Sequence, residues 1–426
     1  MQTNHTRNRV FITGLGTINP IGNDVESYWH ALIEGRNGIA TLKGWPTDKL
    51  TCKLAGQIKN LDLDKHFEPK ELRRTARFSQ IAIIAARQAV AQAGLAPDRP
   101  APGDRPDGVD RDRVGVSNGT SLGSFTDMVE QILSGGPDHE RVSPFFVPRM
   151  LPNMPGAALA MEFGFRGPND TSVTACAAST QSIGNAMRVL QHGHAEAMLA
   201  GGCEANLSDW GISTFAAMKA LTTRNEDPEK ASRPFDRDRD GFVGAEGAGY
   251  LFLETEEHAR GRRAEILAEV IGFGSSDDAY HQVMPEEAGT GAALAVEAAL
   301  RDADIAPDEV GYINAHGTST PLNDKAETAA LKHALGEHAY RVPISSTKSM
   351  TGHVLGGAGA IEAVATVLCL TRGVLHPTIN YETADPDCDL VYIPNVARKK
   401  DVDIAISENF GFGGQNAVVV FRRYSP

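Results

Sequence analysis

The chain has 426 residues, of which 41% are hydrophobic and 22% charged, and its formal net charge is −13. These values are typical of a globular protein with a large core, and the acidic balance argues against nucleic acid as a partner. Five cysteines without close pairing argue against a disulfide framework and fit a reducing cytoplasm. The first nine residues lack the apolar segment of a secretory signal, and no apolar run approaches the ~20 residues of a membrane span.

Strands and helices alternate along the first part of the chain. Short apolar, β-favouring runs predict strands, and apolar residues at helical spacing predict helices. Strands are predicted at 10–16, 114–116, 197–203 and 247–254, and helices at 27–34 and 81–93. Residues 95–113, rich in Pro, Asp, Gly and Arg, predict an exposed loop, and residues 143–148 an irregular apolar turn.

A second series of elements follows. Strands are predicted at 266–271, 310–314, 342–346, 404–406 and 418–421, and helices at 291–303 and 361–370. Both series run from strand to helix to a polar turn at a strand end, which predicts an internal duplication with its change-over near Arg263. Alternating strands and helices predict an α/β protein with largely parallel sheets.

A tight turn between a predicted strand and a predicted helix carries a single cysteine. The segment reads Thr174-Ala175-Cys176-Ala177-Ala178, and the helix follows. At a helix start the thiol faces unpaired backbone N–H groups and the positive end of the helix dipole, and both favour the nucleophilic thiolate. A buried structural cysteine is the common alternative, and this stretch alone leaves both interpretations open.

Three further turns carry residues suited to the same site. They contain His316, then Lys348 with His353, and finally the pair Gly413-Gly414. In open α/β sheets, loops at the carboxyl ends of strands build the active site, and a thiolate with two imidazoles and a lysine suits acyl transfer through a thioester. Taken singly, His316 could be structural, Lys348 solvated and the glycines a bend. The absence of CxxC and HExxH patterns argues against a zinc ribbon or a metalloprotease.

Together these turns resemble the motifs of one family. Thr174 to Cys176, His316 to Pro321, Thr347 to His353 and Asn409 to Gly414 are similar to those of the β-ketoacyl-[acyl-carrier-protein] synthases, closest to the synthase II type. The resemblance runs from Val10 to Phe421. It implies the thiolase fold, an α/β architecture of two duplicated halves in five αβαβα layers, with one domain over 8–424 divided into 8–263 and 264–424.

The resemblance also implies an activity and its partners. It implies decarboxylative condensation of a malonyl carrier with an enzyme-bound acyl group, a homodimer, an acyl carrier protein as partner and no organic cofactor. The same residues distinguish this chain from three related groups of proteins. Thiolases carry a second catalytic cysteine, synthase III enzymes have Asn in place of His353, and chain-length factors lack the cysteine that stands here at 176. A type II polyketide ketosynthase subunit and a non-catalytic carrier-binding partner stay open as alternatives, as does the acyl length.

Roles follow for individual residues by the same resemblance. Cys176 would hold the acyl group, and the N–H groups of Cys176 and Phe412 would form the oxyanion hole, with Phe412 as the gate. His316 and His353 would stabilise the enolate. The remaining implied roles are electrostatic support by Lys348 held by Glu327, and contact of Thr318 and Thr320 with the pantetheine arm.

More distant positions are assigned in the same way. The acyl-tail channel would include Leu122, Phe146 and Phe215, although Leu122 could instead pack the core. The carrier would dock on Lys70, Arg73, Arg74 and Lys219. A monovalent cation would lie near Asn314, Glu362, Ser407 and Glu408, where Glu408 replaces the more common Asn. Val283 and Met284 stand where polar residues usually lie near the substrate amide.

Overall fold

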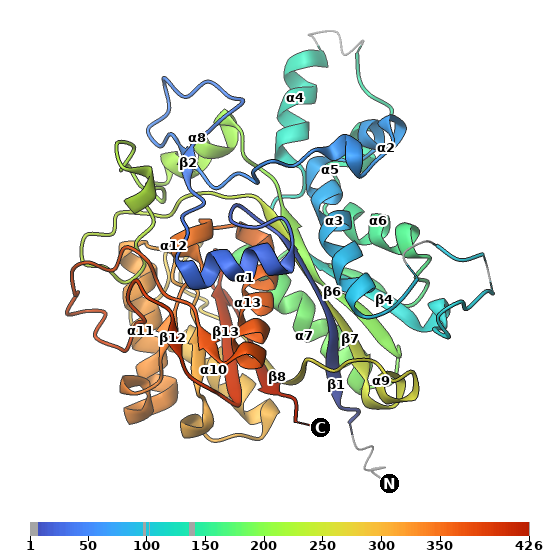
Figure 1. Ribbon diagram of the computed structural model, residues 1–426. Coiled ribbons are helices and arrows are strands. Elements are labelled where there is room, and N and C mark those ends of the chain that lie inside the picture. The colour runs from blue at the N-terminus through green and yellow to red at the C-terminus, as the bar shows by residue number, and fades with distance from the viewer. Residues whose placement is uncertain (1–6, 97–98, 102, 136–140, 426) are drawn as a thin grey trace.

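The structure, a computed structural model, describes residues 7–96, 99–101, 103–135 and 141–425. It is organised around a sheet that runs through the middle of the molecule (Figure 1). The sheet has ten strands in the order β10-β9-β13-β14-β8-β1-β7-β6-β4-β5. The strands are β1 Val10–Ile18, β4 Val114–Gly119, β5 Asn169–Ser172, β6 Ala197–Glu204, β7 Gly247–Thr255, β8 Ala268–Asp277, β9 Tyr312–Asn314, β10 Ile344–Ser345, β13 Ile404–Phe410 and β14 Gln415–Arg423. Two small two-stranded sheets pair β2 Ala40–Thr41 with β3 Leu54–Ala55, and β11 Val374–Leu375 with β12 Arg398–Lys399.

The strand order shows the duplication predicted from the sequence. In the first half the five strands lie in the order β5-β4-β6-β7-β1, and in the second half in the order β10-β9-β13-β14-β8. Numbered within each half, both orders read third, second, fourth, fifth, first. The halves join where β1 pairs with β8, and the predicted division at 263/264 falls in the connection before β8.

The prediction of largely parallel sheets is wrong for the centre of the molecule. The five central pairings, from β13 to β6, are antiparallel, and only the two outer pairings on each side are parallel. For β13 and β14 the reason is the short Gly-rich turn that joins them, whereas the other four antiparallel pairs join strands far apart in the sequence, so long-range packing sets their direction. A short turn returns the chain antiparallel, whereas parallel neighbours need a long crossover.

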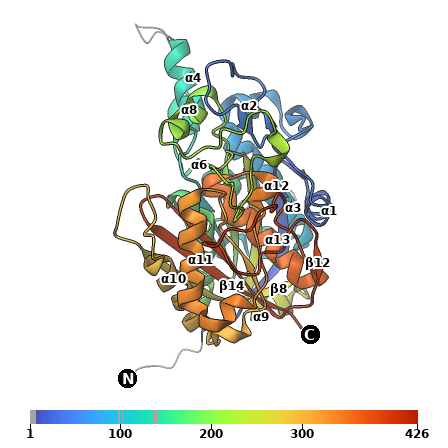
Figure 2. The ribbon, with the colours of Figure 1, turned by 90° about the vertical axis from the view of Figure 1, so that its left-hand side faces the viewer.

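Helices cover the sheet in layers. Helix α3 packs on β1, β7 and β6 with α6 beside it, and α10 packs on β8 and β14 with α11 beside it (Figure 2). Helices α7 and α13 contact each other and strands of both halves, so they form the middle layer. The helices are α1 Val25–Glu34, α2 Pro69–Arg74, α3 Arg77–Gln92, α4 Phe125–Gly135, α5 Phe146–Met150, α6 Met154–Phe163, α7 Ala178–Gln191, α8 Asp209–Ala217, α9 Glu256–Gly261, α10 Thr290–Ala303, α11 Pro321–Leu335, α12 Lys348–Thr351 and α13 Ala358–Arg372.

Short 3₁₀ helices occupy several of the turns. They are η1 Leu63–Lys65, η2 Arg111–Arg113, η3 Ala175–Ala177, η4 Pro228–Lys230, η5 Pro307–Glu309, η6 Gly336–Tyr340 and η7 Leu355–Gly357. The loop predicted at 95–113 is present, although residues 97, 98 and 102 lie outside the described part of the chain. The irregular turn predicted at 143–148 instead ends in helix α5.

The middle layer is the apolar centre of the protein. Side chains of α7 and α13 form one buried cluster with β1, β8 and β14. Within the described residues, the segment Leu355–Arg372 is long and apolar enough to cross a membrane, with a mean hydropathy of 1.3, which the sequence analysis overlooked. Because 89% of that segment is buried inside the protein, its apolar composition reflects a core helix. All five cysteines are free and buried.

Candidate active site

Cys176 lies at the entry to the middle layer. The chain leaves β5 at Ser172, turns through η3 and continues directly into α7. Ala175 has a φ of 46°, a left-handed conformation that lets the chain turn sharply before the cysteine. Cys176 is therefore held at the amino end of α7, as predicted.

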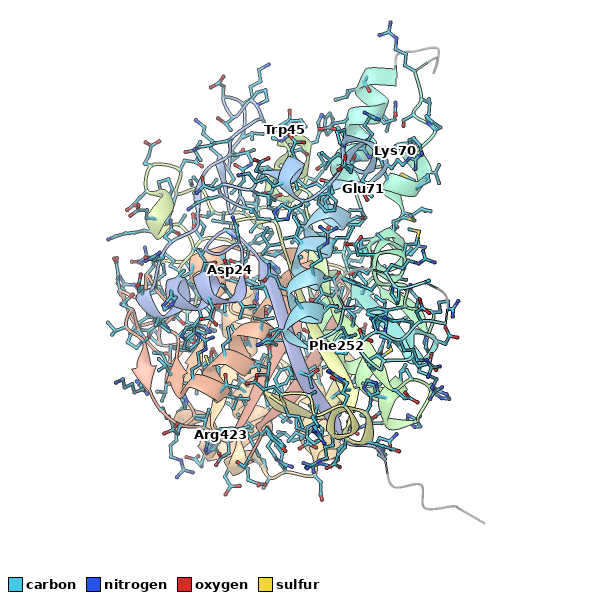
Figure 3. All side chains as sticks on the ribbon, turned by 45° about the vertical axis from the view of Figure 1, so that its right-hand side comes forward. Asp24, Trp45, Lys70, Glu71, Phe252 and Arg423 are labelled. Atoms are coloured by element: carbon cyan, nitrogen blue, oxygen red, sulfur yellow. The ribbon has the colours of Figure 1, made fainter. Side chains whose placement is uncertain are left out.

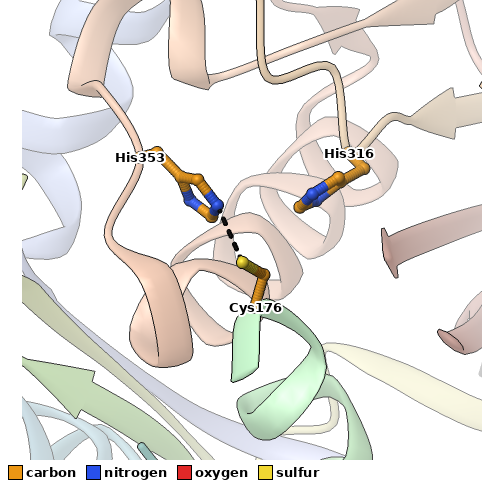
Figure 4. A group of neighbouring side chains, drawn as sticks. All are labelled: Cys176, His316 and His353. Atoms are coloured by element: carbon orange, nitrogen blue, oxygen red, sulfur yellow. Dashed lines mark hydrogen bonds between the residues drawn. The ribbon is translucent and has the colours of Figure 1, made fainter. Parts of the chain in front are cut away.

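The structure brings both predicted histidines to the cysteine. His353 Nε2 lies 3.1 Å from Cys176 Sγ, and the His316 and His353 ring centroids are 5.3 Å apart with the rings nearly perpendicular. The sulfur and one nitrogen of each ring all lie within 4.8 Å of one another. Figure 4 shows both imidazole rings on the same side of the sulfur. All three residues are buried.

Neighbouring donors fix which ring nitrogens carry protons. The backbone N–H of Leu355 donates to His353 Nδ1 over 3.2 Å, and Asn409 Nδ2 lies 3.2 Å from His316 Nδ1. Since Asn409 also donates to Glu362 and accepts from Thr180 Oγ1, its amide nitrogen faces His316. Each Nδ1 is thus an acceptor, which places the proton of each neutral ring on Nε2, the tautomer that can donate into the site.

Burial keeps both imidazoles neutral. It lowers the pKa of His316 and of His353 well below the ordinary value, and nearby Lys348 lowers both further. Neutral imidazoles with Nε2–H act as hydrogen-bond donors and not as acids near neutral pH. This charge state suits the stabilisation of a developing oxyanion or enolate.

The protonation of the cysteine depends on two opposing effects. Burial raises the pKa of Cys176 to about 11, and Lys348 and the backbone N–H of Phe412 lower it only in part. Removal of water from the sulfur thus outweighs the favourable position at the start of α7, whose backbone N–H groups lower the pKa only in part. The resting nucleophile is a thiol with Phe412 N–H directed at its sulfur.

Lys348 is present as predicted, but its carboxylate partner is a different one. Its Nζ lies 2.5 Å from Glu362 Oε1 and 2.5 Å from the carbonyl oxygen of His316, and the side chain is 1% exposed. Glu327, the partner implied by the resemblance, instead accepts from the Gly317 N–H and from Asn323. Lys348, held by its ion pair with Glu362 on α13, thus fixes the backbone of His316 by donating to its carbonyl oxygen.

Asn409 is a site residue whose role the sequence analysis missed. Its amide lies between Thr180 on α7, Glu362 on α13 and His316. It links the helices that follow Cys176 and His353. Its place in the fourth motif indicated a residue of the site. Its role could not be predicted, because its contacts come from three segments that are distant in the sequence.

A cavity of about 390 Å³ leads to the cysteine. Seven of the predicted site residues line it, namely Cys176, Lys219, His316, Thr318, Thr320, His353 and Phe412. Apolar side chains form much of the remaining wall, including Met218, Val283, Met284 and Leu322. An apolar wall with a few polar groups at its base is typical of a site for an extended, largely uncharged substrate.

The predicted tail-channel residues do not line this cavity within one chain. Leu122 is 43% exposed, which makes the alternative that it packs the core wrong. Phe146 begins the half-buried α5, and Phe215 lies beside the cavity with its ring centroid 6.5 Å from that of Phe412. A small apolar pocket next to the cavity contains Phe215 and shares Phe242 and Leu355 with it.

The predicted docking residues lie on the surface. Lys70, Arg73 and Arg74 are exposed on α2, where Arg74 stacks over the ring of Phe145, and Lys219 is exposed at the cavity mouth. Lys70 lies at the end of the molecule built by α2, α4 and α5, opposite the end that holds both termini (Figures 1 and 3). These side chains are therefore exposed, as docking of a carrier protein requires, and the docking itself stays a prediction.

The predicted cation region contains buried oxygens without a partner. Among the described residues, no hydrogen-bond partner is found for Asn314 Oδ1 or Ser407 Oγ. Burial raises the pKa of Glu327 and of Glu408, and a hydrogen bond joins the two carboxyl groups, in which Glu408 holds the proton. Hard oxygen donors of this kind fit a small cation. Glu362 fits less well, because Lys348, Thr347 and Asn409 already occupy its oxygens.

The Cys176–His316–His353 cluster resembles a metal site in ligand type only. A histidine that binds metal through Nε2 donates its Nδ1–H to an acceptor. Here both Nδ1 atoms face N–H donors, from Leu355 and Asn409, so both Nε2 atoms hold protons. The surroundings of the rings select hydrogen-bond donation over metal binding.

Comparisons with known proteins agree with this geometry. The β-ketoacyl synthase N-terminal domain matches residues 7–259 and its C-terminal domain matches residues 267–382. This chain belongs to the β-ketoacyl synthase family. Its relatives include the 3-oxoacyl-[acyl-carrier-protein] synthase 2 of Synechocystis sp., 45% identical over 424 residues that cover 99% of both chains. The protein of the same name from Staphylococcus aureus is 45% identical over 98% of both chains.

Solved structures show the same fold, the thiolase-like fold of ketosynthases. A β-ketoacyl synthase from Burkholderia phymatum superposes with a TM-score of 0.89 at 35% identity, covering 98% of this chain and all of that one. A type II polyketide ketosynthase, solved in complex with its acyl-carrier protein and bound to the hexaketide, has a TM-score of 0.90 at 36% identity, with the same coverage.

Proposed function

We propose that the chain is a 3-oxoacyl-[acyl-carrier-protein] synthase that extends acyl chains by decarboxylative condensation at Cys176. The observation that carries the proposal is the cluster of one thiol and two neutral imidazoles within 4.8 Å at the base of an apolar cavity. A nucleophile and two Nε2–H donors are what acyl transfer followed by enolate chemistry requires.

In the first half-reaction the acyl group moves from its carrier to the enzyme. Cys176 Sγ attacks the thioester carbonyl, the bond to the carrier sulfur breaks, and the proton of Cys176 ends on the departing carrier thiol. The backbone N–H groups of Cys176 and Phe412, which both hydrogen-bond the sulfur, would then stabilise the oxyanion. Loss of one such donor costs about 10²–10³ in rate in other enzymes.

In the second half-reaction a malonyl carrier occupies the cavity. Its bond to the terminal carboxylate breaks, carbon dioxide leaves, and the enolate oxygen accepts hydrogen bonds from His316 and His353 Nε2. The enolate carbon then attacks the acyl carbon, the Cys176 sulfur leaves as a thiolate, and it takes up one proton. Lys348 holds His316 through its carbonyl oxygen throughout.

Specific observations weigh against the alternatives. A non-catalytic partner has no need of a thiol 3.1 Å from an imidazole that is fixed as a donor. The polyketide ketosynthase structures are 34–36% identical, whereas the synthase 2 relatives reach 45% over nearly the whole chain. Fatty acyl elongation is therefore the better supported pathway.

The partners follow from the surface. The exposed basic residues on α2 and Lys219 at the cavity mouth suit an acidic carrier protein, even though the whole chain is acidic. Strand β5 pairs with β4 alone among the described strands, and Val173 beside it is 50% exposed. An edge strand of this kind favours pairing with a second copy, so we include a homodimer in the proposal. The five free cysteines suit a reducing compartment, so a cytoplasmic location is included as well. A bound small cation is included on the unpartnered oxygens described above.

The experiment is an elongation assay with purified protein. Acyl carriers from short to long are mixed with malonyl carrier, and carrier-bound products are read by mass spectrometry. We expect 3-oxoacyl products two carbons longer than the primer, and light scattering at twice the 45.5 kDa chain mass. Activity that appears only after a paralogous subunit is added would favour the polyketide alternative, and no product from any primer would overturn the function.

A further inference from the structure

One fully buried carboxylate near the site has no cation beside it. Glu204 ends β6 with 0% exposure, and among the described residues no lysine, arginine or histidine forms an ion pair with it. A buried carboxylate is costly unless hydrogen bonds satisfy it. Glu204 therefore has to be explained by what it accepts.

Its donors come from two separate turns. Glu204 Oε2 accepts from Ser121 N over 2.7 Å, from Ser121 Oγ over 2.5 Å and from Gly356 N over 3.3 Å. The other oxygen accepts from Asn206, which also donates to the carbonyl oxygen of Gly123 over 3.0 Å. Apart from Asn206, which lies two residues further along the chain, the donors are in the turn at 120–123 after β4 and in η7.

These two turns also touch directly. A Cβ atom added to Gly356 would lie 2.3 Å from Ser121 N, so only glycine lets the backbones approach this closely. The residue before Gly356 is Leu355, whose N–H fixes the tautomer of His353. The turn at 120–123 carries Leu122, the residue assigned to the acyl tail. Glu204 lies behind both turns and does not line the cavity.

We propose that Glu204 is a positioning residue that holds the turn at 120–123 and the turn of His353 in one arrangement. It acts on the reaction through the Leu355 N–H and the His353 ring and touches no reacting atom, while its charge also helps to raise the pKa of the nearby Cys176 thiol. The inference rests on the proposed function, because decarboxylation is the step in which His353 donates to the enolate. Burial raises the pKa of Glu204 to about 7, and Ser121 and the Gly356 N–H oppose that rise.

The primary test is Glu204→Gln. The glutamine side chain has the same size as glutamate, but its NH₂ group replaces one carboxylate oxygen and faces N–H or O–H donors. That hydrogen bond is lost, so the turn at 120–123 and the turn of His353 should separate. We expect the rate of malonyl decarboxylation, divided by the amount of enzyme whose Cys176 can be acylated, to fall about tenfold. The rate at which Cys176 is acylated by a carrier with a short acyl chain should change less than threefold. The longest accepted acyl chain should shift as well.

Glu254 provides the matched control. It is also fully buried and lies at the opposite end of the β6–β7 pair, about 20 Å away by strand rise, where it binds Thr13, His258 and Arg262. Glu254→Gln should lower the melting temperature without changing the ratio of decarboxylation to acylation. If both variants change this ratio equally, or if Glu204→Gln leaves it unchanged, the positioning role is overturned.

A second variant covers the case in which Glu204→Gln does not fold. Ser121→Ala removes only the Oγ hydrogen bond and should lower decarboxylation two- to fivefold with acylation unchanged; an unchanged decarboxylation rate overturns the proposal. The wild-type enzyme is measured in parallel. A wild type without decarboxylation would overturn the proposed function, whereas an active wild type with unaffected variants would overturn the role of Glu204 alone.

Discussion

At the residue scale, the properties of the reactive groups are set by the residues that hydrogen-bond to them. Leu355 N–H and Asn409 turn two ordinary imidazoles into Nε2–H donors, and Lys348 holds the backbone of His316. The thiol is buried among them and keeps its proton. The chemistry therefore depends on these supporting contacts as much as on the three residues that meet the substrate.

The protonation of Cys176 gives a direct pH prediction. With a pKa of about 11, the thiolate fraction rises with pH up to that value, so alkylation by iodoacetamide should accelerate about tenfold per pH unit between 7 and 10. Mass spectrometry of the modified peptide measures the rate at this cysteine alone. A rate that levels off below pH 9 would show that the thiol ionises more easily than its burial indicates.

The buried ion pair between Lys348 and Glu362 can be tested by a double-mutant comparison. Lys348→Met leaves an uncompensated buried carboxylate, and breaking such a pair costs about 3–5 kcal/mol of unfolding free energy. Lys348→Met/Glu362→Gln should recover most of that loss but not decarboxylation, because His316 still lacks its support. Denaturant unfolding and carbon dioxide release check the two parts. Equal stability of the single and double variants would contradict the pairing.

At the scale of elements, Cys176 and His353 enter the middle layer in the same way. Cys176 lies within η3 and His353 lies two residues before η7, and each of these 3₁₀ turns leads directly into a middle-layer helix. Ala175 and Leu355, the first residues of the two turns, have left-handed φ angles of 46° and 48°. The duplicated halves thus supply two equivalent turns, one adapted to carry the nucleophile and one to present the imidazole.

Helix α2 carries the prediction on carrier docking. Arg73→Glu/Arg74→Glu should raise the KM for carrier-bound substrates about tenfold, because exposed charges steer an acidic partner, and should weaken the salt dependence of that KM. Turnover of small pantetheine thioesters should stay nearly unchanged. Arg398→Glu/Lys399→Glu, an equally exposed basic pair on β12, is the matched control. Equal effects of both double variants would argue against a docking role for α2.

At the scale of the whole molecule, the proposed homodimer bears on where the acyl tail would lie. Leu122 and Phe146 do not reach the cavity of a single chain, and Leu122 is largely exposed. The proposed homodimer would complete the tail channel around them. In that case the acyl length accepted is a property of the dimer.

Leu122→Phe tests this arrangement. Because the side chain is exposed within one chain, the larger ring should not cost the 1–3 kcal/mol, roughly, of an overpacked core, and the melting temperature should stay near that of the wild type. The longest acyl chain transferred to Cys176 should shorten, with short primers unaffected. An unchanged length profile would remove Leu122 from the channel.

The sequence predicted the fold class, the duplication and the identity of the residues around the sulfur, because local motifs and strand–helix alternation carry that information. It did not predict that Glu362 would pair with Lys348 in place of Glu327. Both are buried carboxylates on helices, and only packing decides which one lies nearer. The raised pKa of Cys176 and the antiparallel centre of the sheet likewise depend on long-range packing.

The central claim is that Cys176 holds the acyl group while His316 and His353 stabilise the enolate formed by decarboxylation. One assay tests it: intact-protein mass spectrometry and carbon dioxide release are followed together for the wild type, Cys176→Ala and His353→Ala with acyl and malonyl carriers. We predict an acyl adduct and carbon dioxide for the wild type, carbon dioxide without adduct for Cys176→Ala, and adduct without carbon dioxide for His353→Ala. An acyl adduct on Cys176→Ala, or normal carbon dioxide release by His353→Ala, would contradict the claim.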